Sequence, residues 1–391
     1  MADQSLIRPV KKRLVWIDLA KGIGILWVVY FHFFTNYIES DKFANLPSPT
    51  SGHFMKDVLG EHGLDSFWLG CQTIGRLLWL AVSQVGFHAV GLFVLLGGWA
   101  LASTTWRKAD KGPIQWREWY GARFIRLYPM YWVAHLLLLL MPFTWLEPID
   151  SRFLISLSGL RWINVENTFL YGNAAWWYFS MLIELYAIFP ILFIVMRRIG
   201  LVAFLLLLVS IGFGMRYLLL IQWESSGLWI LGANCLSRIP EFALGMVLGI
   251  LHMRNSERIE RYLLGGPAIL AGLVMYLFVG PVHAGNLPYV FADFYTAIAC
   301  SLVVIGISGW LEKSAFCSKW LSLVGSFSFG LYLTHQPLVT WFGQKIKSLS
   351  IPEFLLVSLG VLVVMSAFGI WLERGVNSGI ERFLARSKPS E

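Results

Sequence analysis

Apolar runs long enough to cross a bilayer recur along the whole chain. A helix of about 20 apolar residues spans the hydrocarbon core of a membrane. Two shorter or interrupted runs, 64–80 and 153–163, are more typical of interfacial or re-entrant pieces. The pattern predicts an all-α, polytopic, multi-pass membrane protein of about ten transmembrane helices. The ten predicted segments are 15–38, 83–105, 124–143, 176–196, 199–220, 228–252, 263–281, 289–309, 319–343 and 351–372.

Charged residues are few and unevenly placed. They make up 14% of the chain, against about 25% in a soluble domain. Lys and Arg are concentrated in every second connection between apolar runs, starting with the N-terminal segment. Because cytoplasmic loops of membrane proteins carry the excess of Lys and Arg, both termini are predicted to be cytoplasmic. The formal charge of +8 is thereby explained by membrane orientation, and nucleic acid is not expected as a partner.

The remaining composition adds two expectations. The four cysteines, Cys71, Cys235, Cys300 and Cys317, show no CxxC pairing, so neither a disulfide framework nor a metal site is predicted. No internal repeat or low-complexity tract interrupts the pattern. We therefore expect one membrane-embedded domain over residues 1–391, with no appended soluble domain.

The first apolar run, "LVWIDLAKGIGILWVVYFHFF", contains Asp18, Lys21 and His32. Lys21 and His32 are eleven residues apart, about three helical turns, so they share one face and are separated by roughly 16 Å along the axis. Lys21 can snorkel to the headgroups, and His32 can be a hydrogen-bonded structural residue. Polar groups at this depth also mark functional sites.

A pair of arginines begins the third predicted span. In "GARFIRLYPMYW", Arg123 and Arg126 are spaced i, i+3 at the predicted cytoplasmic side. The positive-inside rule alone explains such residues. The guanidinium fork also suits phosphate, so Lys21, Arg123 and Arg126 can form one cationic mouth.

Deeper polar residues lie in three later spans. Glu184 is inside an apolar run and needs a partner from another helix. Arg238 and Glu241 are spaced i, i+3 and can pair with each other. His335 is predicted at a depth similar to that of His32, where packing, hydrogen bonding or catalysis are all open.

The order of these motifs resembles bacterial acyltransferase family 3, whose members are ten-span membrane enzymes that acylate glycans and other acceptors. The resemblance covers nearly the whole chain. Lys21 stands where the family usually has Arg, as in the branch that acetylates sugar residues of surface glycans, and Gly97-Gly98 stands for the usual Ser-Gly. The matching motifs are Asp18-Leu-Ala-Lys21-Gly22 with His32, Phe93 to Gly98, Arg123 to Tyr131, Trp177 with Glu184 and Pro190, Arg238 to Gly249, Gly325 to His335, and Glu373-Arg374.

The resemblance implies an acyltransferase for groups other than amino-acyl groups, in the bacterial cytoplasmic (inner) membrane. It would move an acyl group, most simply acetyl, from cytoplasmic acyl-CoA to a hydroxyl of a cell-envelope glycan or another extracytoplasmic acceptor, with no metal. Lys21, Arg123 and Arg126 are expected to bind the donor phosphates. His32 is expected to act as general base or to form an acyl-histidine.

Roles for the other polar residues stay open in the sequence. Glu184 is expected in the catalytic site, where it orients the imidazole or binds the acceptor. Asp18, Arg238, Glu241 and His335 are acceptor-site or structural candidates.

Two other classes of membrane protein fit the composition. A lipid or glycan flippase would line its pathway with intramembrane Glu, Arg and His, although many transporters show internal repeats that are not seen here. A structural or sensory subunit would give no matched depths for His32, Glu184 and His335. An enzyme is expected to have a tunnel with the basic mouth at its cytoplasmic end and His32 at its inner end.

Overall fold

The computed structural model describes residues 14–38, 67–140, 150–278 and 286–386, apart from some side chains in α3 and those of Ile38 and Gln344. Within these ranges the chain forms helices and no strands, as the sequence predicts. The α-helices are α1 Val15–Ile38, α3 Phe67–Gln84, α4 Ala89–Ala109, α5 Trp116–Leu140, α6 Ser151–Ser158, α7 Val165–Thr168, α8 Trp177–Ile199, α9 Leu201–Tyr217, α10 Ile239–Arg254, α11 Ser256–Leu263, α12 Gly266–Tyr276, α14 Asn286–Leu311, α15 Ala315–Ser326, α16 Ser328–Lys345 and α17 Ile351–Arg386.

Shorter 3₁₀ and π turns connect several of these helices. They are η2 Val85–His88, η3 Arg161–Asn164, η4 Ala174–Trp176, η5 Leu218–Gln222, η6 Trp229–Ala233 and η7 Cys235–Arg238. Of the two weaker sequence segments, 153–163 falls on α6 and η3. The other, 64–80, falls on α3, with residues 64–66 outside the described part of the chain.

Seven helical stretches of the described residues are long and apolar enough to cross a membrane. Each contains or overlaps one of the ten predicted segments. The other three predictions fall on α5, on the eleven-residue α12, and on α15 with α16, with residues 141–143 and 279–281 outside the described part of the chain. The count of ten spans therefore stays a prediction. The seven stretches are Val15–Tyr37, Leu78–Ala109, Ala174–Ile199, Leu201–Gln222, Cys235–Arg254, Asn286–Leu311 and Ile351–Arg386.

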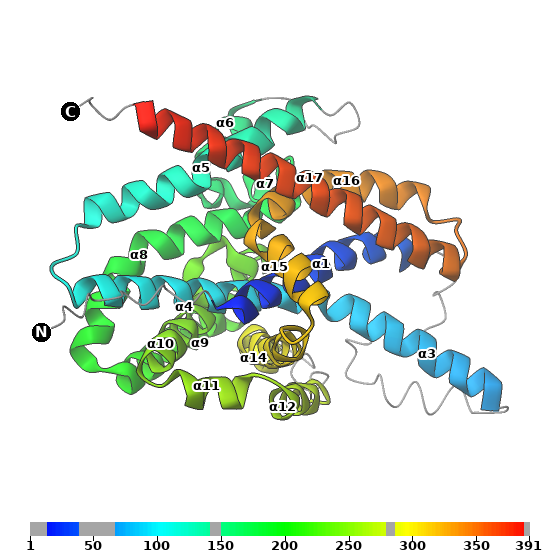
Figure 1. Cartoon of the computed structure of the whole chain (residues 1–391), viewed down its shortest axis with the longest axis horizontal. Helices are drawn as coiled ribbons and strands as arrows, with labels where there is room; N and C mark the ends of the chain where they lie inside the picture. The colour runs from blue at the N-terminus through cyan, green and yellow to red at the C-terminus, as the bar shows by residue number, and fades with distance from the viewer. Residues whose placement is uncertain (1–13, 39–66, 141–149, 279–285, 387–391) are drawn as a thin grey trace, which may run out of the picture.

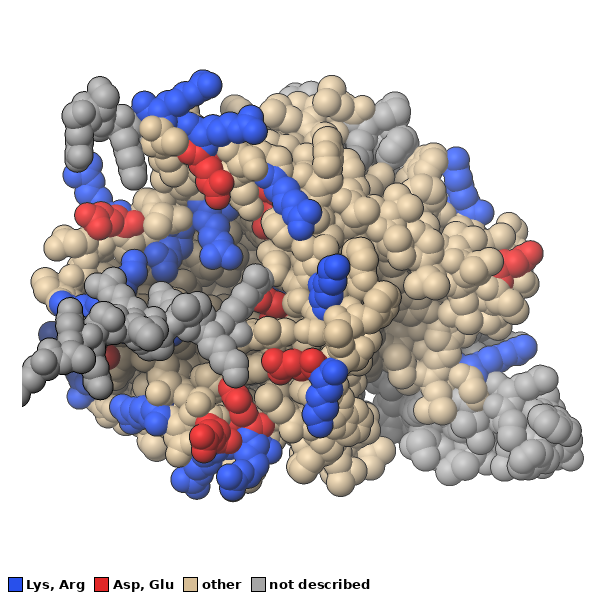
Figure 2. Space-filling view, in the orientation of Figure 1, with Lys and Arg blue, Asp and Glu red and all other residues tan. Residues whose placement is uncertain are grey.

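The helices form a bundle with a clear polarity. The start of α1, the turn between α4 and α5, the turn between α8 and α9, and the end of α17 all lie toward the left of Figure 1. Figure 2 shows Lys and Arg side chains gathered toward the same end. One end of the bundle is thus basic, as the sequence pattern requires. Its assignment to the cytoplasm stays a prediction, and so does the location of the termini.

Small residues let α4 and α10 pack closely. A Cβ on Gly98 would overlap the carbonyl oxygen of Phe242, and one on Gly245 would overlap that of Leu95. Close approach at small residues is the usual way that membrane helices associate, because lipid provides no hydrophobic drive between them. Gly98 of the Gly97-Gly98 motif therefore has a packing role, whereas Gly97 lines the large cavity.

Helix α1 lies at the centre and contacts α4, α14, α15 and α16. Its crossing with α15 is equally tight, since a Cβ on Gly22 would overlap the carbonyl oxygen of Leu321 and one on Gly325 that of Asp18. These contacts hold the part of α1 that carries Lys21 against α15.

The prediction of one helix over 319–343 is wrong, because the chain breaks at Phe327 between α15 and α16. The first N–H groups of a helix need acceptors, above all away from water. Glu373 of α17 provides one, since its Oε2 accepts from the N–H of Gly330 at 2.7 Å. The Arg374 guanidinium lies 4.8 Å from the centroid of the Phe327 ring. Hydropathy registers the apolar run but not the break.

The prediction of one helix over 228–252 is also wrong. The chain forms η6 and η7 before α10 begins at Ile239. Polar side chains satisfy the backbone of this break. Glu184 Oε2 accepts from the N–H of Cys235 at 3.1 Å, and Arg238 Nε donates to the carbonyl of Leu231 at 3.1 Å. Irregular backbone at membrane depth is tolerated where protein groups complete its hydrogen bonds in this way.

Candidate active site

A cavity of about 990 Å³ lies between α1, α4, α5, α8, α16 and α17. Its wall on α1 includes residues three or four apart, namely Ile17, Lys21, Ile25, Val28 and His32. This spacing is one face of a helix. The prediction that Lys21 and His32 share a face is therefore confirmed, and that face lines a cavity.

The end of the cavity near the basic end of the bundle is lined by cations from three helices. The predicted trio of Lys21, Arg123 and Arg126 comes together here. Three further basic residues from the end of α4 and the following turn join it: Arg107, Lys108 and Lys111. Sequence reasoning counted these three only toward membrane orientation. The signal that identifies them is their helical spacing from the cavity-lining residues Phe93, Gly97, Ala100 and Thr104.

Three of the cations have defined partners, and for Arg107 the partner is the carbonyl of Ser103, which accepts from its Nε at 3.1 Å. Lys21 Nζ is 2.9 Å from Asp18 Oδ1. The Arg123 guanidinium lies 4.2 Å from the centroid of the Trp119 ring and donates to the carbonyl of Trp119. Asp18 does not line this cavity, and it forms its ion pair with Lys21 from outside the cavity wall. Its carboxylate therefore has a structural contact with the cationic mouth.

The middle of the cavity is mainly apolar. It is lined by apolar side chains of three helices: Ile25 and Val28 of α1, Phe93 and Leu96 of α4, and Phe329 of α16. A molecule with an anionic head and a long neutral arm fits such a lining, because cations bind the head and apolar walls receive the arm.

Two histidines lie together in the wall, three turns along α1 from Lys21. The ring centroids of His32 and His335 are 5.3 Å apart, with 39° between the ring planes. Both line the cavity, and His335 is fully buried. The sequence predicted a similar depth for the two residues, and the structure makes them neighbours.

The turn of α16 that carries His335 is fixed by hydrogen bonds to a backbone carbonyl that Pro337 leaves without its helical donor. Pro337 has no N–H, so the carbonyl of Leu333, four residues earlier, loses its helical donor. The Trp176 Nε1–H donates to this carbonyl at 2.9 Å and the Asn173 amide at 3.2 Å. Tyr332 adds a third tie, since its hydroxyl donates to the carbonyl of Ala175 at 2.8 Å.

The segment that provides these donors is organised by Arg161. This side chain is fully buried, and its guanidinium donates to the carbonyls of Phe169 and Asn173 at 3.0 Å and to that of Tyr171. The sequence indicates only a loop charge at Arg161. The structure makes it a buried organiser of the loop that supports α16.

Glu184 does not line the cavity. Its carboxylate accepts from Cys235 in the broken segment before α10, as described above. No contact places it against His32, so the expectation that it orients the imidazole finds no geometric support.

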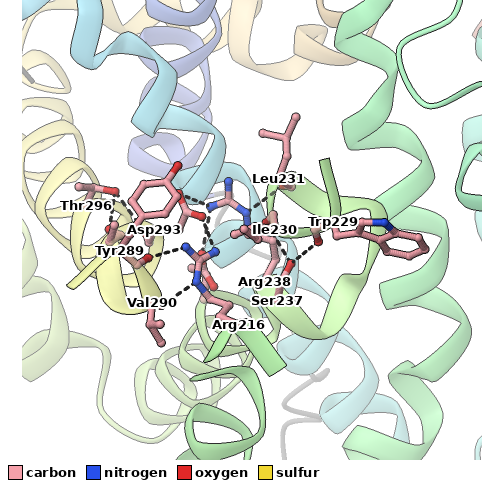
Figure 3. A network of polar contacts seen from close by, with 12 residues as sticks. Arg216, Trp229, Ile230, Leu231, Ser237, Arg238, Tyr289, Val290, Asp293 and Thr296 are labelled. Carbon is pink, nitrogen blue, oxygen red and sulfur yellow. Dashed lines mark hydrogen bonds and ion pairs between the residues drawn. The ribbon is translucent and has the colours of Figure 1, made fainter. Parts of the chain in front are cut away.

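Arg238 and Glu241 form the pair that their spacing predicts, with Nη1 and Oε1 3.3 Å apart. Arg238 also belongs to a larger cluster with Arg216 and Asp293 (Figure 3). Asp293 of α14 lies between two arginines, with its Oδ1 3.2 Å from Arg238 Nη1 and its Oδ2 2.6 Å from Arg216 Nη1. Two positive and two negative side chains thus meet in one place.

Backbone carbonyls also accept hydrogen bonds from Arg216 of this ion cluster. Arg216 Nε donates to the carbonyl of Val290 at 2.6 Å, and its Nη2 donates to that of Tyr289 at 2.8 Å (Figure 3). Neither arginine lines the large cavity. The cluster connects α9, α10 and α14 and has the character of a structural network.

Comparison with known protein families gives one match. The family model described as an acyltransferase domain, that of acyltransferase family 3, matches residues 14–373. Comparison with curated proteins and with solved structures gave no significant match. The match includes part or all of every helix that lines the cavity, and a cationic mouth leading to two imidazoles is suited to acyl transfer. The chain therefore belongs to acyltransferase family 3.

Proposed function

We propose that this membrane acyltransferase transfers an acetyl group from acetyl-CoA to a hydroxyl of a cell-envelope glycan. One observation carries the proposal. A single cavity is lined by basic side chains at one end and by His32 further along α1. The rise of a helix separates Lys21 from His32 by roughly 16 Å, a distance that a pantetheine arm can cover.

The basic residues are assigned to the donor. Lys21, Arg123 and Arg126 bind the CoA phosphates, and Lys108 of α4 and Lys111 of the following turn extend this charge toward the rim of the mouth. Cations from three helices surround the phosphates, and the arginine forks give directional hydrogen bonds. The apolar middle of the cavity then receives the arm and excludes water from the thioester.

His32 is assigned as the general base. Its imidazole takes the proton of the acceptor hydroxyl while the oxygen attacks the thioester carbonyl. A C–O bond forms, the C–S bond breaks, and the imidazolium returns the proton to the departing thiolate to give free CoA. Histidine suits both transfers because its ordinary pKa is near the working pH.

The proposal places the acceptor on the extracytoplasmic side of a bacterial cytoplasmic membrane. His32 lies about 17 residues above the start of α1, or roughly 25 Å at ~1.5 Å per residue, while the basic mouth lies at the other end. Acetyl groups would enter from the cytoplasm and leave on a glycan outside. CoA itself would not cross. Glu184 takes no part in the reaction in this proposal.

The test uses purified protein in sealed inside-out vesicles. Labelled acetyl-CoA is added to the bath, and a glycan fraction from the host envelope is enclosed in the lumen. Mass spectrometry is expected to find acetylated glycan in the lumen. Acetylation of a bath-side glycan alone would overturn the cross-membrane arrangement. Movement of unmodified glycan would instead indicate a flippase, and no acetylation in either compartment would overturn the proposed function.

A further inference from the structure

His335 leaves one buried nitrogen unused. Its Nδ1 is 2.7 Å from the carbonyl oxygen of Tyr332. A carbonyl only accepts hydrogen bonds, so Nδ1 carries the hydrogen and Nε2 of the neutral ring is a bare acceptor. Among the residues that the structure describes, no group donates to this Nε2, although it is buried. Buried polar atoms are rarely left in this state.

The neighbouring imidazole of His32 is a suitable donor for this nitrogen, although the structure shows no hydrogen bond between the two rings. The His32 ring touches Phe31, with centroids 5.0 Å apart, and His335, at 5.3 Å. Within the described part of the chain, no hydrogen bond fixes which nitrogen of His32 carries its proton. A general base needs a fixed tautomer, with a bare nitrogen aimed at the hydroxyl. A donor bond from His32 to His335 Nε2 would provide this, because the other nitrogen of His32 would then be bare.

The support around His335 is rigid enough for such a role. Its turn of α16 is tied by Tyr332 to Ala175 and by the Leu333 carbonyl to Trp176 and Asn173. A precise site needs a first residue whose orientation is held by a packed and hydrogen-bonded second layer. Here the supporting residues include the buried Arg161, whose guanidinium donates a hydrogen bond to the carbonyl of Asn173.

We propose that His335 is a positioning residue for the transferase reaction: its Nε2 accepts a hydrogen bond from the His32 imidazole and thereby sets the tautomer in which His32 removes the proton of the acceptor hydroxyl. The proposal rests on the proposed function. His335 itself exchanges no proton with substrate. The bonds that form and break are those already given for the transfer, and the proton still passes from the hydroxyl to His32 and on to the thiolate.

Two substitutions separate this role from a merely structural one. The amide of an asparagine reaches the place of Nδ1, so His335→Asn keeps the donor to Tyr332 and loses the acceptor at Nε2. The longer glutamine places its carbonyl oxygen near Nε2, so His335→Gln keeps the acceptor. The two variants therefore have the same amide group, and they differ in whether an acceptor remains at the position of Nε2.

The measurement is the release of free thiol from acetyl-CoA in the presence of the host envelope glycan fraction. His335→Asn is expected to lower kcat on the order of 100-fold, as a misplaced reacting group does, with KM for acetyl-CoA little changed. His335→Gln is expected to retain most of kcat. In a His32→Ala background, His335→Asn should have no further effect, because the two residues act as one unit.

Equal kcat values for the two variants, whether both low or both near wild type, would overturn the proposal. Nitrogen NMR of labelled histidine in the wild-type protein provides a second measurement that needs no variant of His335. It is expected to show a bare Nε2 on His335, and a proton on that atom would also overturn the proposal. A wild-type protein that transfers no acetyl group would remove the proposed function itself, and this inference would fall with it. If the wild type is active, equal kcat values for the two variants would count against the role of His335 alone.

Discussion

The molecule has two groups of ionisable side chains among apolar helices, and they differ in whether their charges are balanced by charges of the opposite sign. In the ion cluster, Arg216, Arg238, Asp293 and Glu241 balance one another in charge. Two backbone carbonyls accept from Arg216, and Glu241 Oε2 has no hydrogen-bond partner among the described residues. In the cavity, cations outnumber acids, and a buried nitrogen of His335 has no partner among the described residues.

This difference distinguishes polar side chains that stabilise the fold from polar side chains that bind substrate and take part in the reaction. A buried charge is tolerated when its partners are built into the fold, and such a pair is costly to break. A site that must bind a polyanion and move a proton instead keeps unsatisfied capacity for its ligands. From the sequence, Arg238 and His32 are equally unusual residues in apolar runs. Their surroundings decide which of them holds the bundle together and which faces substrate.

Among the substitutions that test this difference between the two groups, His32→Ala is expected to have the largest effect on activity. The loss of a general base is expected to lower the rate of acetyl transfer by about 10²–10⁴. Thermal unfolding should change less than it does for the loss of a buried ion pair, because the His32 side chain lines the cavity and carries no paired charge. Transfer is measured with labelled acetyl-CoA, and insertion is checked by membrane fractionation. Near-wild-type turnover in a well-inserted variant would remove His32 from the reaction.

Asp293→Asn is expected to have the opposite profile. It removes a charge that faces both Arg216 and Arg238, and breaking a buried pair costs about 3–5 kcal/mol of unfolding free energy. The midpoint of thermal unfolding in detergent should fall clearly, while the folded fraction keeps its turnover per molecule. An unchanged midpoint together with a lost turnover would place the ion cluster in the functional machinery.

Single alanine substitutions of Lys21, Arg123 and Arg126 are expected to weaken donor binding. Hydrogen bonds to charged groups contribute about 1.5–3 kcal/mol each, so calorimetry with CoA should show a weaker Kd. Titration with dephospho-CoA should reveal which residue binds the 3′-phosphate. Lys319→Ala is the matched control, because Lys319 lines a separate small pocket with Asp18 and Lys313. Wild-type affinity in all three variants would contradict the assignment of the mouth to the donor.

The smallest effect is expected for Glu184→Gln. The amide oxygen still accepts from the N–H of Cys235, so the broken segment before α10 keeps its hydrogen bond. The loss of charge should change stability by about 1 kcal/mol and leave the transfer rate within a few-fold of wild type. A loss as deep as that of His32→Ala would return Glu184 to the reaction, and denaturant titration would separate this result from unfolding.

Features that depend on local helical geometry can be predicted from the sequence alone. The common face of Lys21 and His32 follows from a spacing of eleven residues in a regular helix. The pairing of Arg238 with Glu241 follows from a spacing of three residues, and it forms although Arg238 lies in the turn just before α10. The all-helical class and the family resemblance were also available from the sequence. These features need no knowledge of which helices are neighbours.

Contacts between residues of different helices, in contrast, depend on how the helices pack and cannot be predicted from local spacing. His335 faces His32 across 303 positions of sequence, and Glu184 reaches Cys235 instead of the cavity. The breaks before α10 and α16 are invisible to hydropathy, since the acceptors and donors that permit them come from other helices, as Glu373 does for Gly330. Membrane helices choose their neighbours through close packing at residues such as Gly98 and Gly325. That packing, rather than the apolar pattern, brings a binding site together.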